Sequence, residues 1–368
     1  MKRLLFFAFL SVNSVAFGQT LIITQLCELP SEVIETSGLE NGPDDCFWTH
    51  NDSGNPSVLY CLDTTGVIQR TVTVVGDANT DWEDIANDNL GNMYIGNFGN
   101  NSLNRTDLRI VKVPSIDTCT GTTFVTDIIN FSYPDQMNFP PSGSYGNFDM
   151  EAFFWYQDSL HLFSKDRSNP STGYTKHYTL PTSGGTYIAN LIDSLETGGT
   201  SFIYSVTSAD ISEDGQSIAL LNSDRIWLCT NYTGTNFFGG QVSELLLGDF
   251  SQKEGVCFKN GFLYVTDEES FGLGGKMYRI NPVLFVSAAN TLVDFDLQPV
   301  YNLKLHLTEI KLPENQPVEW HLYTKAGKLI QTGKSMNRIF ANEFQVSKGV
   351  FVLRISSEGL QKALLIKL

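Results

Sequence analysis

The segment Asp81-Trp82-Glu83-Asp84-Ile85 belongs to a short turn-and-strand motif that occurs five times in this 368-residue chain. The other copies are Glu35-Thr36-Ser37-Gly38-Leu39, Asp149-Met150-Glu151-Ala152-Phe153, Thr207-Ser208-Ala209-Asp210-Ile211 and Gln252-Lys253-Glu254-Gly255-Val256. Successive copies start 46, 68, 58 and 45 residues apart, which is the range of β-propeller blades rather than of short solenoid repeats. We therefore predict an all-β protein, a five-bladed β-propeller in which each copy opens the innermost strand of a blade.

Short β-branched or aromatic segments, bounded by Gly, Asn, Asp or Pro, follow each copy and predict the outer strands. Fourth strands are expected at residues 67–75, 123–131, 186–193 and 241–247. The last blade lacks one, and we expect residues 21–27 to supply it and so close the ring without an exposed sheet edge. Six blades are the alternative, because the longest step contains residues 132–145, which we interpret as a loop.

Residues 1–18 have the order of a secretory signal peptide: Lys2-Arg3, an apolar run, and small residues up to Gly18. The run is shorter than the roughly 20 residues of a spanning helix, so we expect a protein without a membrane span that passes through the periplasm to the cell surface or the medium. With 40 acidic and 24 basic residues the formal net charge is −16. This charge disfavours nucleic acid and anionic membranes as partners.

The chain changes character near residue 298. Residues 19–297 form the predicted propeller, and residues 298–368 alternate as a small antiparallel β-sandwich whose lysines reverse the local charge. This tail resembles the C-terminal sorting domain of the type IX secretion system of Bacteroidetes, with its motifs at residues 322–329, 346–355 and 362–368, and with Phe351 where that family usually has Tyr. The resemblance implies export by the type IX secretion machinery. An Ig-like accessory sandwich is the alternative.

Residues 30–280 resemble the SdiA-regulated propellers and the related esterase-like phytase propellers. The resemblance lies in the motif copies and in segments such as Trp48-Thr49-His50-Asn51-Asp52-Ser53-Gly54 and Leu263-Tyr264-Val265-Thr266-Asp267-Glu268. The chain departs from the family where Asp84 replaces a glycine and where Ala209 replaces an acid. The resemblance implies a calcium-binding or esterase-like propeller.

All six cysteines lie after residue 18, and an even number in an exported chain favours disulfides. Folding the chain about the turn Ser53-Gly54-Asn55-Pro56 places Cys46 opposite Cys61, so we predict a disulfide between them. Cys229 with Cys257 is the next candidate pair. Buried free thiols are the alternative for all six.

The acids of the motif copies should converge near one mouth of the central channel, because each copy opens an inner strand. Such carboxylates repel one another, and a bound cation, water or raised pKa values must relieve that. Calcium, which takes six to eight oxygen ligands, is the ion we predict. Its candidate ligands are Glu35, Asp81, Glu83, Asp149, Glu151 and Glu254, with Asp210, Asn97, Asn222 and Asp267 as further oxygen donors. The alternative is that inner-strand acids bond backbone amides of the next blade and hold no ligand.

Two functions remain open from the sequence. One is a ligand-binding or calcium-dependent hydrolytic module acting on an unidentified small molecule, with His50, Glu83 and Glu151 as candidate catalytic groups because imidazole and carboxylate can move protons. In that case the reaction would be that of an esterase, lactonase or phosphoesterase. The other is a non-catalytic propeller that recognises a glycan or protein, in which the acids are structural.

Overall fold

The computed structural model describes residues 19–20, 23–141, 143–198, 204–248, 250–270, 273–280, 298–301, 307–311, 317–324, 329–346, 350–357 and 360–367. The predicted signal peptide, residues 1–18, lies outside these ranges, as do residues 21–22 of the predicted closing strand.

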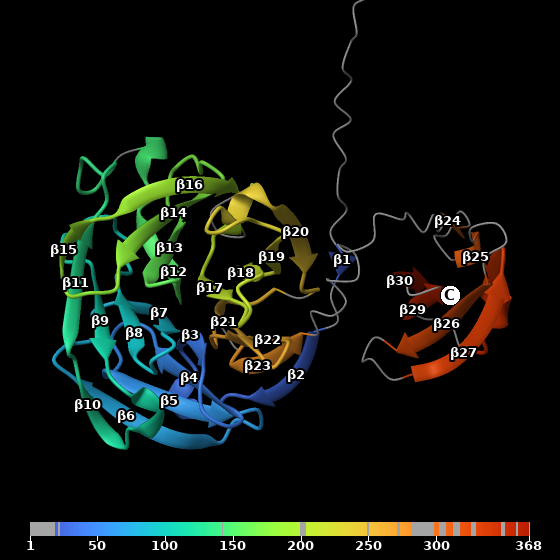
Figure 1. Ribbon diagram of the computed structural model, residues 1–368, viewed down its shortest axis with the longest axis horizontal. Helices are drawn as coiled ribbons and strands as arrows, with labels where there is room; N and C mark the ends of the chain where they lie inside the picture. The colour runs from blue at the N-terminus through green and yellow to red at the C-terminus, as the bar shows by residue number, and fades with distance from the viewer. Residues whose placement is uncertain are drawn as a thin grey trace, which may run out of the picture.

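Five sheets are arranged around one axis as the blades of a propeller (Figure 1), which confirms the five-bladed prediction. Each blade has four antiparallel strands, and the motif copy opens the innermost one in every blade. From the axis outward they are β3 (Thr36–Asn41), β4 (Cys46–Asn51), β5 (Val58–Asp63) and β6 (Ile68–Val75) in blade 1; β7 (Trp82–Asn87), β8 (Met93–Asn97), β9 (Arg109–Val113) and β11 (Asp127–Ser132) in blade 2; β12 (Asp149–Tyr156), β13 (Ser159–Lys165), β14 (Tyr174–Pro181) and β16 (Asn190–Glu196) in blade 3; β17 (Ser208–Ile211), β18 (Ser217–Leu221), β19 (Arg225–Thr230) and β20 (Gln241–Leu246) in blade 4; and β21 (Lys253–Lys259), β22 (Phe262–Asp267), β23 (Lys276–Ile280) and β2 (Ile23–Glu28) in blade 5.

The N-terminal segment closes the ring as predicted. Strand β2 pairs antiparallel with β23, in a register that sets Ile23 against Ile280 and Glu28 against Lys276. The outermost strand of the last blade therefore comes from the start of the chain. Pairing the two ends of the propeller in one sheet removes the free edge that an open ring would expose.

A fifth strand is added to three blades by a device that the sequence did not reveal. Strands β10 (Gly121–Phe124), β15 (Gly185–Ile188) and β1 (Gln19–Thr20) pair parallel with β6, β11 and β20. Each short strand lies just before the fourth strand of the next blade, so the chain adds to one sheet before it enters its neighbour.

The prediction of single strands at residues 123–131 and 186–193 was therefore wrong in its bounds. Each segment contains two strands that belong to different blades, β10 and β11 in the first and β15 and β16 in the second. The sequence of each segment gives no sign of where one strand ends and the next begins. By contrast, residues 133–141 contain no strand, and with η3 (Gly143–Tyr145) they form the expected loop.

Inner strands of neighbouring blades approach closely near the axis. A Cβ built on Gly38, whose φ is +70°, would lie 2.9 Å from the Asp84 Cα, and one on Gly255 would lie 2.8 Å from the Leu39 Cβ. Glycine at these motif positions thus allows the blades to meet. Between the blades, buried aromatic and aliphatic side chains such as Phe98 and Phe153, whose ring centroids are 5.4 Å apart, form the cores.

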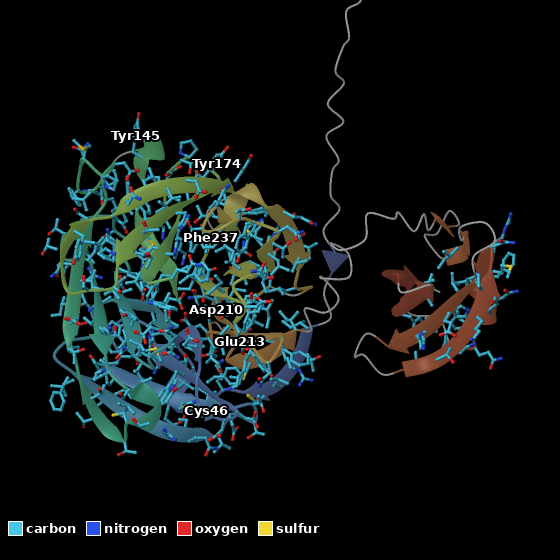
Figure 2. All side chains as sticks on the ribbon, viewed as in Figure 1. Cys46, Tyr145, Tyr174, Asp210, Glu213 and Phe237 are labelled. Atoms are coloured by element: carbon cyan, nitrogen blue, oxygen red, sulfur yellow. A yellow bond between two sulfur atoms is a disulfide. The ribbon has the colours of Figure 1, made fainter. Side chains whose placement is uncertain are left out.

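Buried acids of the inner strands bond backbone amides of neighbouring blades. Glu40 accepts the Asn87 N–H at 2.9 Å, and Asp210, which lies near the centre of the propeller in Figure 2, accepts the Phe258 N–H at 2.6 Å. Asp84 accepts N–H groups from Phe153 at 3.1 Å and Ala209 at 3.2 Å, so one carboxyl joins blades 2, 3 and 4. Some inner-strand acids therefore do bond backbone amides of the next blade, as the alternative in the sequence analysis predicts. The residues that do so are Glu40, Asp84 and Asp210.

The predicted disulfide between Cys46 and Cys61 is present, with Cα atoms 5.6 Å apart. The register of β4 and β5 differs from the expected one, because Cys61 lies opposite Trp48 and Cys46 lies opposite Asp63. The two cysteines are thus diagonal neighbours on one face of the sheet. Cys229 and Cys257 are buried free thiols in separate core clusters, so the second candidate pair is not formed.

Loss of this disulfide should lower the free energy of unfolding by about 3 kcal/mol, the value expected for closing a loop of about 15 residues. We expect the Cys46→Ala/Cys61→Ala variant to show this loss in urea unfolding, and added reductant to have no further effect on it. Cys119→Ala, which removes a cysteine that is in no disulfide, is the matched control. Equal stability of the double variant and the control would contradict the prediction.

The C-terminal residues form a small antiparallel β-sandwich, as predicted. Its two sheets contain β24 (Gln298–Tyr301), β25 (Leu307–Lys311) and β28 (Arg338–Phe340), and β27 (Leu329–Met336), β26 (Pro317–Thr324), β29 (Val350–Ser357) and β30 (Leu360–Lys367). Ile310 and Ile339 of the first sheet share a core with Trp320 and Leu353 of the second. In the part of the chain that the structure describes, no helix is long and apolar enough to cross a membrane.

Candidate functional site

The inner strands begin at one end of the channel, which we call the mouth. Because the second strand of each blade runs antiparallel to the first, the residues that end it reach the same mouth. The pairing of Asp149 with Lys165 and of Trp82 with Asn97 shows this directly. The mouth therefore receives side chains from two places in each blade, the start of the first strand and the end of the second.

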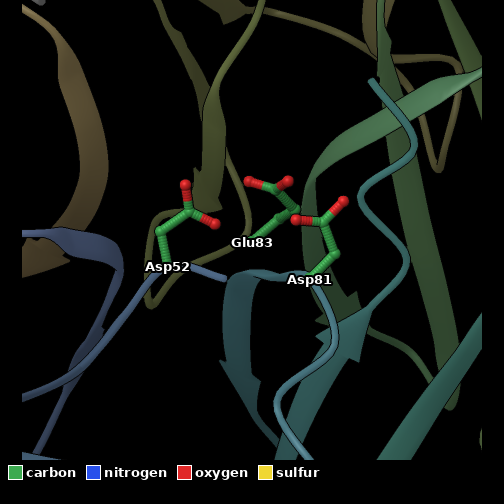
Figure 3. A group of neighbouring side chains, drawn as sticks. All are labelled: Asp52, Asp81 and Glu83. Atoms are coloured by element: carbon green, nitrogen blue, oxygen red, sulfur yellow. The ribbon is translucent and has the colours of Figure 1, made fainter. Parts of the chain in front are cut away.

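Three carboxyl groups meet over blades 1 and 2. Asp81 directly precedes β7, Glu83 lies on β7, and Asp52 follows β4. One carboxylate oxygen from each lies within 4.8 Å of the other two, and Figure 3 shows the groups turned toward one another. We call this set the acidic cluster. The separation fits three ligands of one ion, since two oxygens that each lie about 2.4 Å from an ion are at most twice that distance apart.

The backbone of the loop after β8 lies close to this cluster. A Cβ built on Gly99, in the loop after β8, would lie 2.7 Å from the Asp81 carboxylate and would overlap the Glu83 carboxylate. Only glycine leaves room there for both acids. The Glu83 carboxylate accepts no hydrogen bond and forms no ion pair among the residues that the structure describes, although its residue is only 4% exposed.

The neighbouring acids of blade 3 do have cationic partners. Lys165 Nζ lies 2.9 Å from Glu151 Oε2, and Arg167 Nε lies 2.6 Å from Asp149 Oδ2. Arg167 also reaches Glu151 at 3.3 Å. Two carboxylates are thus neutralised inside the mouth, while the three of the acidic cluster form no ion pair with a basic side chain of the described residues.

Burial and mutual repulsion shift the titration of these acids. Burial raises the pKa of Asp149 to about 7, with the charge of Glu151 adding to the effect. The pKa of Glu83 lies well above its ordinary value, first because of burial and then because of Glu151 and Asp52. Burial also raises the pKa values of Asp52 and Asp81. A buried carboxyl group with a raised pKa must either take up a proton or be matched by a positive charge. The acidic cluster therefore has the electrostatics that a cation site requires.

Two other predicted ligands, Glu35 and Glu254, are not among the three residues of the acidic cluster, although the Asp52 N–H donates to the Glu35 carbonyl at 2.9 Å. Glu35 is exposed and accepts a hydrogen bond from Asn55 Nδ2 at 2.5 Å. Glu254 on β21 is 6% exposed, and its Oε2 is a buried atom without a hydrogen-bond partner. Burial raises the pKa of Glu254 to about 7, although Lys165 opposes the shift.

His50 is fully buried between blades 1 and 2. Its Nδ1 donates to the Asn51 carbonyl at 3.0 Å, and its ring meets Trp82 edge-on at 5.4 Å. Burial lowers the pKa of His50 to about 4, so the ring is neutral near pH 7. These contacts are those of a packed core histidine.

The further oxygen donors of the sequence analysis have structural partners. Asp210 joins blades as described above, and Asp267 accepts the Tyr278 hydroxyl at 2.9 Å and the Lys276 N–H at 2.8 Å. Asn97 donates to Asp77 at 2.7 Å, and Asn222 accepts two N–H groups in the turn before β19.

A cavity of about 380 Å³ opens over blades 3 to 5. Its wall carries five hydroxyl side chains together with Lys165, Arg167, Gln252 and Glu254, and it also includes Phe250 and Leu273. The hydroxyl residues are Ser205, Thr207, Ser223, Ser251 and Ser270. We call it the serine-rich cavity. The mouth thus has an acidic part and a hydroxyl-rich part.

Sequence reasoning missed Asp52 as a candidate ligand, and Lys165 and Arg167 as counter-ions of the neighbouring acids. The pattern that could have found them was available, since all three end or follow a second strand, as Asn97 and Asp267 do. Lys165 ends β13 and Arg167 follows it, a position where ordinary turn chemistry is the simplest interpretation of the sequence. Only their neighbour Asp166 fits that interpretation, because it accepts N–H groups from Ser168 and Thr172 within its own loop.

No family model and no curated protein matches this chain. Among solved structures it is similar to the PQQ-bound aldose sugar dehydrogenase of Streptomyces coelicolor, at 11% identity and a TM-score of 0.44, over 70% of this chain and 97% of that one. It is similar to PorZ, a surface component of the type-IX secretion system of Porphyromonas gingivalis, at 10% identity and a TM-score of 0.30, over 90% of this chain and 51% of that one.

A putative gluconolactonase is similar at 12% identity and a TM-score of 0.37, over 67% of this chain and 73% of that one. Likenesses this distant carry no argument about activity or partners. The resemblances to SdiA-regulated propellers and to a sorting domain therefore stay predictions, and the propeller fold rests on the strand order itself.

Proposed function

We propose that the propeller binds calcium at Asp52, Asp81 and Glu83 and uses the ion to hold an oxygen-bearing ligand at the mouth. The observation that carries this proposal is the contrast within one site. Asp149 and Glu151 have basic partners at 2.6 and 2.9 Å, whereas the acidic cluster has none in the described chain. Three carboxylates supply only part of the six to eight oxygens that calcium takes, so positions remain for water and for a ligand.

Calcium should raise the melting temperature of the wild-type protein, because an ion that binds only the folded state stabilises it by about 2.7 kcal/mol at one hundred times its Kd. Glu83→Gln should abolish this shift and calcium uptake in titration calorimetry. The same substitution should raise the melting temperature in EDTA, since it removes a repelling charge from a cluster that lacks its ion.

Glu196→Gln, which neutralises an acid at the end of β16 outside the mouth, is the matched control and should keep the full calcium response. A purely structural role for Glu83 predicts the opposite sign in EDTA, namely a loss of stability. No calcium uptake by the wild-type protein, with equal melting temperatures in calcium and in EDTA, would contradict the proposal.

Calcium-dependent hydrolysis of an ester, lactone or phosphoester is a second candidate. It is favoured by the position of Lys165 and Arg167 beside the acidic cluster, since their N–H donors and a bound ion would stabilise negative charge on a substrate oxygen. Glu151 holds Lys165 in place there. We assign His50 no step, because its ring is buried and its Nδ1 is engaged. Turnover of aryl esters or phosphoesters that needs calcium and is lost in Glu83→Gln and Glu151→Gln would establish this activity.

We also propose that residues 1–18 and the C-terminal module direct export through the type IX secretion machinery. Support comes from the signal-like order of the first residues and from the basic and apolar terminal strand β30. Mass spectrometry of protein from the medium of a secreting host should show a chain that begins after residue 18.

A further inference from the structure

The serine-rich cavity lies at the same mouth as the acidic cluster but over different blades. Its volume, about 380 Å³, lies at the small end of the range of about 300 to 1,000 Å³ for ligand pockets. That size suits a compact ligand of one or two rings.

The polar groups of the cavity suit a ligand that both donates and accepts hydrogen bonds. The Thr207 hydroxyl donates to the Lys253 carbonyl at 2.6 Å, and Ser251 donates to Asp267 at 2.5 Å. These bonds fix the two side chains, while each oxygen keeps at least one lone pair, because a hydroxyl has one donor and two acceptor positions. Ser223 and Ser270 add further hydroxyl groups to the wall.

Glu254 adds to the cavity wall a carboxyl group with one unpaired oxygen. The residue lines the cavity and is 94% buried, yet its Oε2 has no hydrogen-bond partner among the described residues. An unsatisfied buried oxygen costs free energy. A turn of the Glu254 side chain toward a ligand hydroxyl in the cavity would remove that cost.

The charges of the wall favour a neutral ligand. Lys165 and Arg167 are matched by Glu151 and Asp149 through ion pairs of 2.6 to 3.3 Å, so they leave little attraction for an anion. Lys165 also opposes the charge of Glu254, which weakens the attraction for a cation.

Two apolar side chains complete the wall. Phe250 is 49% exposed and Leu273 is 64% exposed. The C–H faces of a sugar ring pack on such surfaces, while the ring hydroxyls seek donors and acceptors. Hydroxyls, a carboxyl acceptor and an apolar face thus occur together on one wall.

We propose that the serine-rich cavity binds a neutral saccharide, with Glu254 accepting from ring hydroxyls and Phe250 packing on the ring face. This site does not need the cation of the proposed function, because neither side chain belongs to the acidic cluster.

Titration calorimetry of the full chain against a panel of neutral hexoses, N-acetylhexosamines and their disaccharides tests the proposal, with galacturonate and glucosamine as the charged probes. We expect at least one neutral sugar to bind, and to bind as well in EDTA as in calcium. Phe250→Ala and Glu254→Gln should each weaken that binding at least tenfold. Phe124→Ala, which truncates an exposed phenylalanine on β10 of blade 1, should leave it unchanged.

Phe250 is exposed, so its variant keeps the test valid even if Glu254→Gln fails to fold. Absence of binding by every neutral sugar would overturn the proposal, and so would binding that both substitutions leave intact. Tighter binding of galacturonate or glucosamine would overturn the neutral class of ligand. Loss of sugar binding in EDTA would place the ligand on the cation instead, whereas sugar binding without calcium uptake would refute only the proposed function.

Discussion

Asp84→Ala is expected to lower the free energy of unfolding by about 3 to 6 kcal/mol, the largest effect of any substitution considered in this chain. The carboxyl accepts three backbone N–H groups, from Ile85 at 3.0 Å, Phe153 at 3.1 Å and Ala209 at 3.2 Å. Asp84 is fully buried. Each donor left unsatisfied costs about 1 to 3 kcal/mol, and three blades lose a common contact at the axis.

Asp84→Asn should cost far less, about 1 kcal/mol. Burial holds the pKa of Asp84 well above its ordinary value, so the native side chain is close to a neutral group, and the amide oxygen of Asn can still accept. Urea unfolding measures both variants. Asp210→Ala leaves two N–H groups without an acceptor rather than three, so its loss of stability should lie between those of the two Asp84 variants.

The exposed Asp107, whose side chain is 59% accessible, provides the control, since Asp107→Ala should change stability by about 1 kcal/mol or less. If Asp84→Ala were no more destabilising than this control, the axial carboxyl would not join the blades.

Lys165→Met is expected to cost about 3 to 5 kcal/mol near pH 8, because breaking a buried ion pair leaves its partner uncompensated. Lys165 contacts Glu151 at 2.9 Å and opposes the charge of Glu254. Methionine fills most of the same space, so the lost charge accounts for the effect.

This cost should grow from pH 5 to pH 8. Burial already raises the pKa of Glu254 from its ordinary value of 4.5 to about 7, and removing Lys165 raises it further. A carboxyl whose folded pKa is raised binds more protons in the folded state, so stability falls as pH rises above the unfolded pKa. At pH 5 the carboxyl is protonated in both variants and the difference is smaller.

Lys176→Met is the matched control in the adjacent strand β14. Its ion pair with Asp135, at 2.6 Å, is more open to water, because the Asp135 side chain is 32% accessible against 2% for Glu151, and such pairs contribute about 1 kcal/mol or less. We expect a small loss that changes little over the same pH range, measured by urea unfolding. A Lys165→Met variant that behaves in the same way would show that Lys165 is not the counter-ion of the mouth.

The repeat pattern predicted the blades well because propeller geometry is largely local. Each motif copy opens an inner strand, and the missing strand of blade 5 required a donor, which Ile23–Glu28 supplied. The split of residues 121–132 and 185–196 between blades could not be predicted. A period-two pattern shows which residues alternate between faces, but it does not show which sheet a strand joins.

The sequence predicted two of the three residues of the acidic cluster. Asp81 and Glu83 lie two residues apart on one strand face, so their meeting could be expected from alternation alone. Their third partner, Asp52, comes from another blade, and the ion pairs that exclude Asp149 and Glu151 from the acidic cluster depend on where β13 ends.

By itself the amino-acid sequence determined the number of blades, the closing strand, the disulfide partners and the end of the channel where acids gather, because each follows from spacing along the chain. Only the tertiary structure decided which acids face one another, which meet a cation and which join blades. Those outcomes depend on distances between residues far apart in sequence, because hydrogen bonds and ion pairs form only when their atoms lie within about 3 to 4 Å.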